Sequence, residues 1–292
     1  MNILVIGGTG TVGSAVVREL LARHQTVRVL TRGDGRRVPA GVTPVQGDLL
    51  EPATVRSVFT GIDAVFLLNA VSTTEAHEGV MAVNGARLAG VRALVYLSVH
   101  GPEGAPHLPH FASKIAVEAA VRASGLRYTI LRPNNFFQND YWFKDVLLGH
   151  GVYPQPLGAA GVSRVDVRDI AEAAAEALLS EAHAGEVYNL VGPEALTGEA
   201  TAAAWGRALG RAVVYGGEDM DAWERQMLAM LPAWMAFDFR LMYEHFQRHG
   251  LKATPEDVAR QTALIGHAPR AFDDFARETA AAWKGEGGAA QG

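Results

Sequence analysis

The first 21 residues constrain the fold of this chain more than any other stretch. Residues 2–6 form a short apolar run without polar alternation, as in a buried parallel strand. Residues 14–21 repeat apolar side chains at helical spacing, and three glycines, Gly7, Gly10 and Gly13, lie between the two runs. A strand that turns at once into a helix leaves the first N–H groups of that helix unpaired. Because glycines keep side chains out of that space, the stretch predicts a loop that binds the diphosphate of a dinucleotide.

The spacing of this loop is G-x-x-G-x-x-G, which differs from the simplest dinucleotide fingerprint, G-x-G-x-x-G. A glycine triplet alone is also compatible with a purely structural turn, so the prediction depends on the strand–turn–helix context. The loop positions expected to contact the cofactor are Gly7, Thr9, Gly10, Thr11, Val12 and Gly13.

Composition narrows the class of protein. A chain of 292 residues forms one large domain or two small ones, and its net charge of −5 argues against binding to nucleic acid. There is no cysteine, and the ten histidines show no metal-binding spacing, so no metal site is predicted. No run reaches the ~20 apolar residues of a membrane span, and the first strand begins too early for a signal peptide. We therefore expect a cytoplasmic protein with no membrane partner.

The first half of the chain alternates strands and helices. Further strands are expected over residues 27–31, 42–46, 64–68, 93–98 and 128–132, with helices over 75–89 and 110–124. This repetition predicts an α/β fold, a doubly wound parallel Rossmann sheet with helices on both faces. Ligands of such sheets bind at the carboxyl ends of the strands.

The second half follows another pattern. Loops are expected over 149–161, an alanine-rich helix to about residue 179, short strands over 186–190 and 212–215, and helices over 220–283. We therefore predict a Rossmann core over 1–150 and a smaller, mostly helical substrate-side region over 151–284, interleaved with the core. Residues 285–292 are of low complexity and are expected to be a flexible tail.

The end of the second predicted strand indicates which dinucleotide is bound. NAD-binding folds carry an acid there for the free ribose 2′-hydroxyl, whereas this chain carries Arg32, with Arg36 and Arg37 just beyond. A guanidinium binds a 2′-phosphate through two parallel hydrogen bonds. NADPH is therefore the expected cofactor in preference to NADH, with Arg32 as the main contact. The alternative is that these arginines belong to an ordinary solvated loop.

Other strand ends supply the remaining cofactor positions. Asp48 follows the third strand and suits either an adenine edge or the N-cap of the next helix. The further positions expected to line the cofactor at strand ends are Leu49, Leu68, Asn69 and Pro133.

Several segments together resemble the NmrA-like branch of the atypical short-chain dehydrogenases/reductases. They are residues 5–13, 95–98, 110–114 with Glu118, 124–139 and 266–276, so the resemblance covers nearly the whole chain. It implies a Rossmann fold and an NADPH cofactor. The branch contains NADPH-dependent quinone, azo-dye and triphenylmethane-dye reductases, plant phenylpropanoid reductases, and redox-sensing regulators that bind cofactor without turning it over.

The resemblance also implies candidate catalytic residues. Short-chain dehydrogenases usually place a Tyr four residues before a Lys on one helix face, where the Tyr delivers a proton. The resemblance implies that Lys114 touches the cofactor and acts as acid or base, with a solvated helix lysine as the alternative, but His110 occupies the tyrosine position. His110 is either a proton donor near neutral pH or a residue that starts the helix beside Pro109. Ser98 matches the serine at the end of the fifth strand, with a turn hydroxyl as the alternative.

The same resemblance places Asn135 and Phe136 over the nicotinamide. They follow the strand that ends near Pro133. Tyr141, Trp142 and Phe143 come next and suit either the pocket of a flat aromatic substrate or the apolar core. The expected function is that of an NADPH-dependent reductase acting on a quinone, an azo compound or a conjugated carbonyl. The alternative is a non-catalytic redox sensor that acts through a protein partner. The sequence leaves the oligomeric state open.

Overall fold

The computed structural model describes residues 1–33, 35 and 38–289. They fold into two compact units, each assembled from separate stretches of the chain. The first unit comprises Met1–Pro133, Val167–Leu190 and Arg260–His267, and the second comprises Asn134–Asp166, Val191–Ala259 and Ala268–Gly292.

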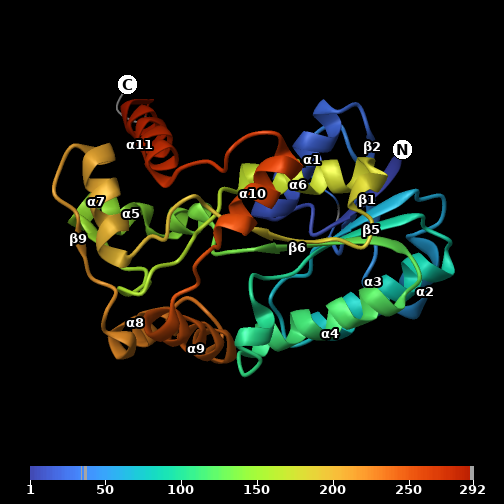
Figure 1. Cartoon of the computed structure of the whole chain (residues 1–292), viewed down its shortest axis with the longest axis horizontal. Helices are drawn as coiled ribbons and strands as arrows, with labels where there is room; N and C mark the ends of the chain where they lie inside the picture. Colours follow the sequence, from blue (N-terminus) through green and yellow to red (C-terminus); the bar gives the residue numbers. More distant parts are fainter. Residues whose placement is uncertain (34, 36–37, 290–292) are drawn as a thin grey trace. The chain divides into compact units, whose positions relative to one another are not determined.

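A seven-stranded sheet, parallel throughout, forms the centre of the first unit (Figure 1). Its strands follow the order β3-β2-β1-β4-β5-β6-β8. They are β1 (Asn2–Ile6), β2 (Thr26–Thr31), β3 (Thr43–Gln46), β4 (Ala64–Leu67), β5 (Ala93–Leu97), β6 (Arg127–Pro133) and β8 (Val187–Leu190). All residues of β4 and β5 are buried, as expected for strands covered on both faces. The predicted doubly wound sheet is confirmed.

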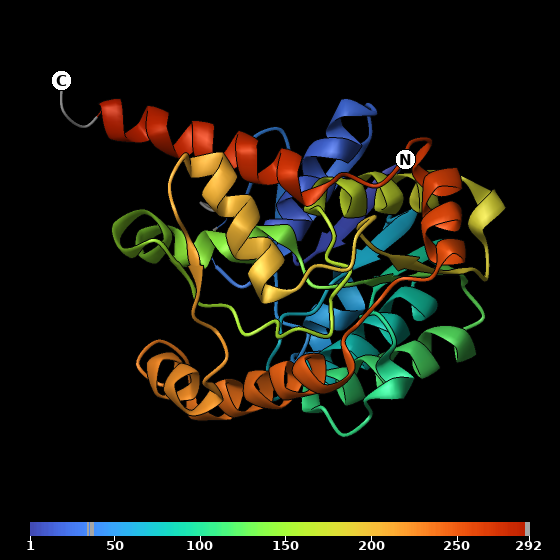
Figure 2. The same cartoon turned by 60° about the vertical axis from the view of Figure 1, so that its left-hand side comes forward.

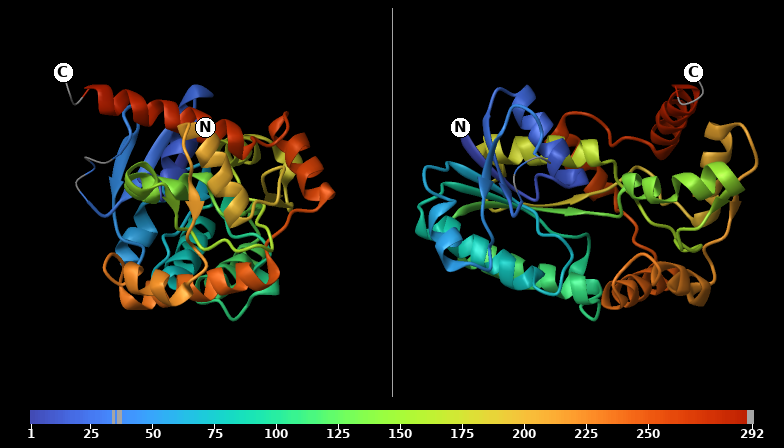
Figure 3. Two further views of the ribbon diagram at one scale, coloured as in Figure 1. Left: turned by 90° about the vertical axis from the view of Figure 1, so that its left-hand side faces the viewer. Right: turned by 180° about the vertical axis from the view of Figure 1, so that it is seen from behind.

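Helices cover both faces of this sheet (Figure 1; Figure 3, right). The helices α1 (Thr11–Ala22) and α6 (Val167–Leu179) pack against each other on one face. The other face carries α2 (Pro52–Ser57), α3 (Glu75–Leu88) and α4 (Pro109–Ala123), with α3 packed against α4. Short 3-10 turns occupy η1 (Pro102–Gly104) and η3 (Glu181–His183). Because each crossover helix returns the chain to the start of a parallel strand, all the strands end at the same edge of the sheet.

The second unit is mainly helical. Its elements are η2 (Phe137–Phe143), α5 (Lys144–His150), β7 (Val152–Tyr153), α7 (Gly198–Leu209), β9 (Val214–Tyr215), α8 (Met220–Met227), α9 (Ala233–His249) and α11 (Phe272–Ala289). The helix α10 (Pro255–Ile265) has residues in both units. In the second unit α7 lies beside α11 (Figure 2), where Trp205 stacks on Trp283 with ring centroids 5.0 Å apart. Aromatic residues of these two helices, Trp205, Phe272, Phe275 and Trp283, therefore form a core.

Several local features differ from the sequence expectations. The helix α7 was not predicted, although the Thr197 hydroxyl caps it by accepting a hydrogen bond from the Ala200 N–H. The short strand β7 lies where only loops were expected, because Val152 pairs with Val214 of β9. The expected tail over 285–292 overlaps α11, which ends at Ala289.

Arg36 and Arg37, the additional candidates for binding the 2′-phosphate, lie outside the described residues. Within the described residues, no helix has the length and apolar character needed to cross a bilayer.

Candidate functional site

The glycines of the first loop divide into two kinds. A Cβ atom at Gly13 would lie 2.1 Å from the Gly7 carbonyl oxygen, and one at Gly7 would lie 2.6 Å from the Leu68 carbonyl oxygen. Both glycines therefore allow the close approach of backbone segments. Gly10 differs, because the nearest atom to an added Cβ would be the Gly7 oxygen at 3.5 Å, and its φ of −88° suits any residue. The protein itself has room for a side chain at Gly10, so this space is available to a ligand.

The helix that follows this loop begins without a cap. Gly10 is the N-cap of α1, no side chain caps the helix, and its first turn carries no acidic residue. The first helical hydrogen bond runs from the Ser14 N–H to the Gly10 carbonyl at 2.9 Å. The N–H groups of Thr11, Val12 and Gly13 have no partner among the described residues. This arrangement of free donors at a positive dipole end suits an anion such as a diphosphate.

The ends of β2 and β3 lie beside the loop. Arg32 is exposed just after β2 and forms no ion pair with another described residue. Asp48 follows β3, and its side chain accepts a hydrogen bond from the Leu50 N–H at 2.9 Å, which is an Asx turn. The N-cap of α2 is Glu51, so the alternative prediction that Asp48 caps this helix is wrong. The turn between Asp48 and Glu51 delays the helix by three residues. Leu49 is buried beneath this edge.

Asn69 lies directly after β4 and has an unusual environment. Its side chain is 4 % exposed, yet neither its amide nitrogen nor its amide oxygen has a partner among the described residues. Gly79 of α3 leaves room for it, since a Cβ there would lie 3.1 Å from the Asn69 oxygen. A buried amide without hydrogen bonds is costly, and such a group normally has a ligand or an ordered water as its partner. The preceding residue, Leu68, is half-buried and shields the base of the glycine loop.

Lys114 forms a buried ion pair at the end of β5. Its Nζ atom lies 2.7 Å from Glu75 Oε1, and both side chains are almost completely buried. The same nitrogen donates a long hydrogen bond of 3.5 Å to the Leu97 carbonyl and lies 5.6 Å from the centroid of the Tyr96 ring. Burial and the charges of Glu75 and Glu118 raise the pKa of Tyr96 well above its ordinary value, so this phenol stays protonated.

The other two candidate catalytic residues are also buried in the first unit. His110 is the second residue of α4, one turn before Lys114, and its ring meets that of Phe111 edge-on. The Ser98 hydroxyl lies beside Glu118 without making a hydrogen bond of ordinary geometry. Burial opposes the ionisation of Glu118, but hydrogen bonds from Arg132, the contact with Ser98 and nearby positive charges lower its pKa overall.

The remaining candidate residues are divided between the units. Pro133 ends β6 in the first unit, whereas Asn135 and Phe136 begin the second unit. The Asn135 side-chain oxygen accepts a hydrogen bond from Arg164 Nε at 3.0 Å, and the Phe136 carbonyl accepts one from Arg164 Nη2 at 2.7 Å. These hydrogen bonds from Arg164 therefore hold the chain at Asn135 and Phe136 in place within the second unit. Arg164 is a residue that the sequence analysis did not identify.

Arg164 is the centre of a fully buried network in the second unit. It forms an ion pair with Asp140 at 2.7 Å, and it also donates to the Tyr153 hydroxyl at 3.2 Å. Trp205 Nε1 donates to the same carboxylate at 2.9 Å. Burial raises the pKa of Tyr153 well above its ordinary value and that of Tyr243 to about 12. The phenols thus remain neutral hydrogen-bonding groups.

The aromatic residues predicted to line a substrate pocket have different environments. Phe143 belongs to the apolar core of the second unit, which agrees with the alternative offered for it. Tyr141 is partly exposed and lies against Phe275 of α11, with ring centroids 5.7 Å apart. Trp142 is 65 % exposed. All three lie in the 3-10 helix η2.

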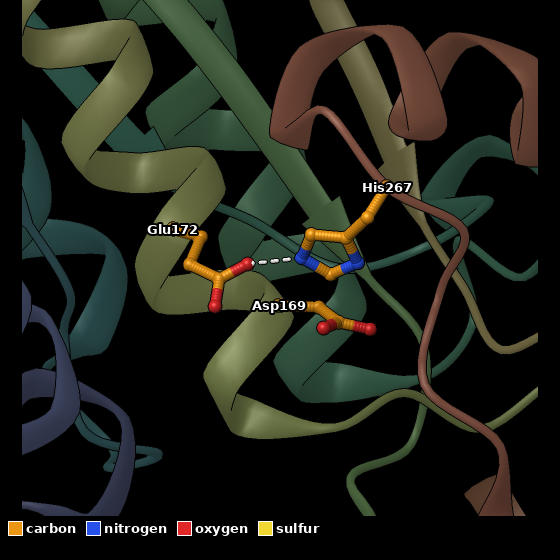
Figure 4. A group of neighbouring side chains, drawn as sticks. All are labelled: Asp169, Glu172 and His267. Atoms are coloured by element: carbon orange, nitrogen blue, oxygen red, sulfur yellow. Dashed lines mark hydrogen bonds and ion pairs between the residues drawn. The ribbon is translucent and has the colours of Figure 1, made fainter.

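A separate polar trio lies between α6 and the loop after α10 in the first unit (Figure 4). Asp169, Glu172 and His267 bring one potential metal-binding atom each to within 4.8 Å of one another. His267 Nε2 lies 2.6 Å from Glu172 Oε2, so a hydrogen-bonded ion pair accounts for two of these groups. The spacing of the three residues in the sequence has no metal-binding signature.

This combination of features defines a class of protein. The strand order, the glycine turn after β1 and the uncapped start of α1 are those of a Rossmann fold. The residues present fit an NADP(H) molecule, because free N–H groups suit its diphosphate, Arg32 suits a 2′-phosphate, and Asn69 has unused hydrogen-bonding groups.

Comparison with known proteins identifies the family. The model of the NmrA-like family matches residues 1–275, and the chain belongs to this family. It is 32% identical to an NAD(P)H azoreductase from Xenophilus azovorans, over 96% of this chain and 99% of that protein. It is 35% identical to a (4-alkanoyl-5-oxo-2,5-dihydrofuran-3-yl)methyl phosphate reductase from Streptomyces griseus, over 97% of this chain and 100% of that protein. The structure of the NADPH-dependent quinone oxidoreductase QOR2 from Escherichia coli, complexed with NADPH, superposes with a TM-score of 0.84. Its sequence identity is 24%, and the match covers 95% of this chain and 99% of that one.

Proposed function

We propose that this protein is an NADPH-dependent reductase that transfers hydride to a small, planar, electron-poor acceptor. The acceptor is a quinone, an azo compound or a conjugated carbonyl. The single observation that carries the proposal is the uncapped start of α1 behind Gly10, where free N–H groups adjoin a space that the protein leaves open.

The first unit has a suitable group for each part of the cofactor. The N–H groups at the start of α1 would hold the diphosphate, and Arg32 would bind the 2′-phosphate in preference to a free hydroxyl. Asp48 and Asn69, on either side of the loop, offer hydrogen bonds to the sugar and base oxygens and nitrogens. When bound, the reduced nicotinamide supplies the hydride.

Two relatives support the acceptor class. The names of the proteins from Xenophilus azovorans and Streptomyces griseus describe reduction of an azo compound and of an alkanoyl-substituted dihydrofuranone. Both acceptors contain a conjugated, electron-poor double bond. Their similarity to this chain extends over nearly its full length, so the acceptor class is a reasonable proposal for this protein too.

The local chemistry of α4 agrees with such an acceptor. The Tyr that short-chain dehydrogenases use as acid is replaced by His110, and Tyr96 is held protonated by burial. A quinone or azo acceptor gives a product whose added charge is spread over a conjugated system, so it needs less help from a protein acid than a simple ketone does. Lys114 provides a buried positive charge at the end of β5.

Turnover tests the proposal directly. Purified protein is mixed with NADPH and, separately, with 1,4-naphthoquinone, methyl red and a simple aldehyde, and the absorbance of reduced nicotinamide is followed. We expect NADPH to be consumed with the quinone or the azo dye and much more slowly with the aldehyde. Flat traces for every acceptor, with tight NADPH binding retained, would contradict the proposal and support the redox-sensor alternative.

A further inference from the structure

The buried ion pair between Lys114 and Glu75 joins two helices that are distant in the sequence. Glu75 is the first residue of α3, and Lys114 lies in the middle of α4. The side chain of Glu75 is 0 % exposed and that of Lys114 is 7 % exposed, and the two charged atoms are 2.7 Å apart. Placing the carboxylate at the N-terminus of α3 is favourable, because the positive end of the helix dipole lies there.

Stability alone does not explain this pair. Burying two charges costs free energy that their attraction barely recovers, and apolar residues of similar size often stabilise a core as well or better. The Lys114 nitrogen lies 5.6 Å from the centroid of the Tyr96 ring, and Tyr96 belongs to the hydrophobic core of the first unit. A charged pair in this place therefore calls for a role in the site.

The hydrogen bonds of Lys114 are incomplete. An ammonium group has three N–H donors. Glu75 Oε1 lies 2.7 Å away in an ion pair without hydrogen-bond geometry, and the Leu97 carbonyl accepts one hydrogen bond at the long distance of 3.5 Å. One donor has no oxygen partner among the described residues, at the carboxyl end of β5.

Lys114 lies at the end of β5, three strands along the sheet from β2, which Arg32 follows. Neighbouring strands lie about 4.8 Å apart, so the distance from β2 to β5 across β1 and β4 is about 14 Å. Arg32 and the glycine loop would hold the 2′-phosphate and the diphosphate of a dinucleotide, with Asn69 next in the strand order. Lys114 would then be the group nearest its nicotinamide half.

We propose that Glu75 is a positioning residue for Lys114: its carboxylate holds the ammonium at the end of β5 with one N–H directed to the nicotinamide half of the cofactor. This inference rests on the proposed function, because it requires NADP(H) bound at the strand ends. Glu75 does not itself touch the ligand. Its effect on the site passes through Lys114.

A double-mutant cycle tests the inference. The variants are Glu75→Gln, which keeps the shape but removes the charge, Lys114→Met, which removes the ammonium, and the combination of both. We expect Glu75→Gln to lower kcat with 1,4-naphthoquinone by about tenfold or more and to change KM by less. In the Lys114→Met background, Glu75→Gln should have no further effect on kcat, because the residue through which it acts is gone.

A second readout does not depend on turnover. The fluorescence of bound NADPH reports the surroundings of its nicotinamide, and we expect Glu75→Gln and Lys114→Met to change the emission in the same direction and non-additively. If the parent binds NADPH but reduces no acceptor, the proposed function fails, while this cycle still tests the role of Glu75. Additive effects in both readouts, or unchanged kcat and emission in Glu75→Gln, would overturn the inference.

Two controls separate positioning from folding. Glu78→Gln removes a partly exposed carboxylate one turn further along α3, where it accepts a hydrogen bond from Thr74, and should leave kcat and emission unchanged. Glu75→Asp retains the charge and should recover part of the lost rate. Urea unfolding of every variant shows which are folded, and the double variant, which leaves no unpaired buried charge, is expected to be at least as stable as Lys114→Met.

Discussion

Each unit of this protein buries a cation against a carboxylate, but the Arg164 and Lys114 clusters differ in how completely their hydrogen-bonding groups are satisfied. In the second unit, Arg164 has five N–H donors, and all of them have acceptors, including both oxygens of Asp140. In the first unit, Lys114 has one close partner, Glu75, and Asn69 nearby in the strand order has none among the described residues.

The difference distinguishes a structural cluster from the proposed binding site. A fully connected polar network rigidifies a core, whereas buried donors and acceptors without partners impose a cost that a ligand can relieve. A shifted pKa does not by itself distinguish the two clusters, since burial raises the pKa of Tyr96 beside Lys114 and of Tyr153 beside Arg164. The useful criterion is the number of unused hydrogen bonds.

The largest expected effect tests the structural role of the Arg164 cluster. Arg164→Met leaves the Asp140 carboxylate buried without its counter-charge, and we expect the free energy of unfolding to fall by about 3–5 kcal/mol. Urea denaturation followed by tryptophan fluorescence measures the change. Arg248→Met is the control, because Arg248 is 69 % exposed and pairs with Glu244 on the surface of α9, and it should cost less than about 1 kcal/mol. If Arg164→Met also lost less than about 1 kcal/mol of unfolding free energy, the Arg164 cluster would have no special structural role.

The glycine loop provides a sharper test of the proposed binding site, the other side of the comparison. Gly10→Ala adds a Cβ that meets no protein atom closer than 3.5 Å, so the unfolding free energy should change by less than about 1 kcal/mol. Its NADPH dissociation constant should rise by at least about tenfold, and Gly10→Val should abolish binding, because the side chain occupies the diphosphate space. Isothermal titration calorimetry measures the NADPH dissociation constants of both variants.

Gly13→Ala is the matched variant for this loop. Its Cβ would lie 2.1 Å from the Gly7 oxygen, so a loss of stability of about 1–3 kcal/mol or more is expected in the absence of any ligand. If Gly10→Ala binds NADPH as the parent does, the open space beside Gly10 is not the cofactor site.

Cofactor preference gives an effect of intermediate size. Arg32→Ala should weaken NADPH by roughly 10-fold to 150-fold, the cost of losing one charge-assisted hydrogen-bond partner, and leave NADH nearly unchanged. Dissociation constants for both cofactors are compared at one fixed ionic strength. Arg87→Ala removes the same charge from an exposed position in the last turn of α3 and should affect neither. Equal affinity of the parent for NADH and NADPH would show that Arg32 belongs to an ordinary solvated loop.

The smallest effect concerns pH. Hydrogen bonds from Arg132 help to lower the pKa of Glu118 below its ordinary value of 4.5, so its ionised form favours the folded state. The stabilisation is complete above pH 4.5 and is lost as the pH falls through the lowered folded-state value. Glu118→Gln should therefore destabilise the protein more at about pH 7 than at about pH 3, as measured by urea unfolding. A cost independent of pH would mean that Glu118 acts through packing rather than charge.

Much of the fold follows from local sequence signals. Apolar runs such as residues 2–6 and 93–97, separated by helical periodicity, predict the parallel sheet, because a strand buried on both faces has no polar alternation. The glycine turn and the position of Arg32 after β2 also follow from local signals, since both lie next to a strand end in the chain itself, and their contacts with the cofactor stay a prediction. The helix α7 was missed although its signals, Thr197 and an alanine run, are local.

The tertiary structure alone decided which polar groups meet. Glu75 and Lys114 lie on different helices, and only the packing of α3 against α4 brings their charges to 2.7 Å. The partners of Arg164 likewise come from separate stretches around Asn135, Asp140 and Tyr153, which no residue spacing connects. Sequence patterns determine local conformation through backbone geometry and periodicity, but burial and hydrogen-bond satisfaction are set by contacts between distant segments. The sequence therefore determined the strand–turn–helix at which a dinucleotide is proposed to bind, and the folded chain decided which buried charges meet and which polar groups are left without a partner among the described residues.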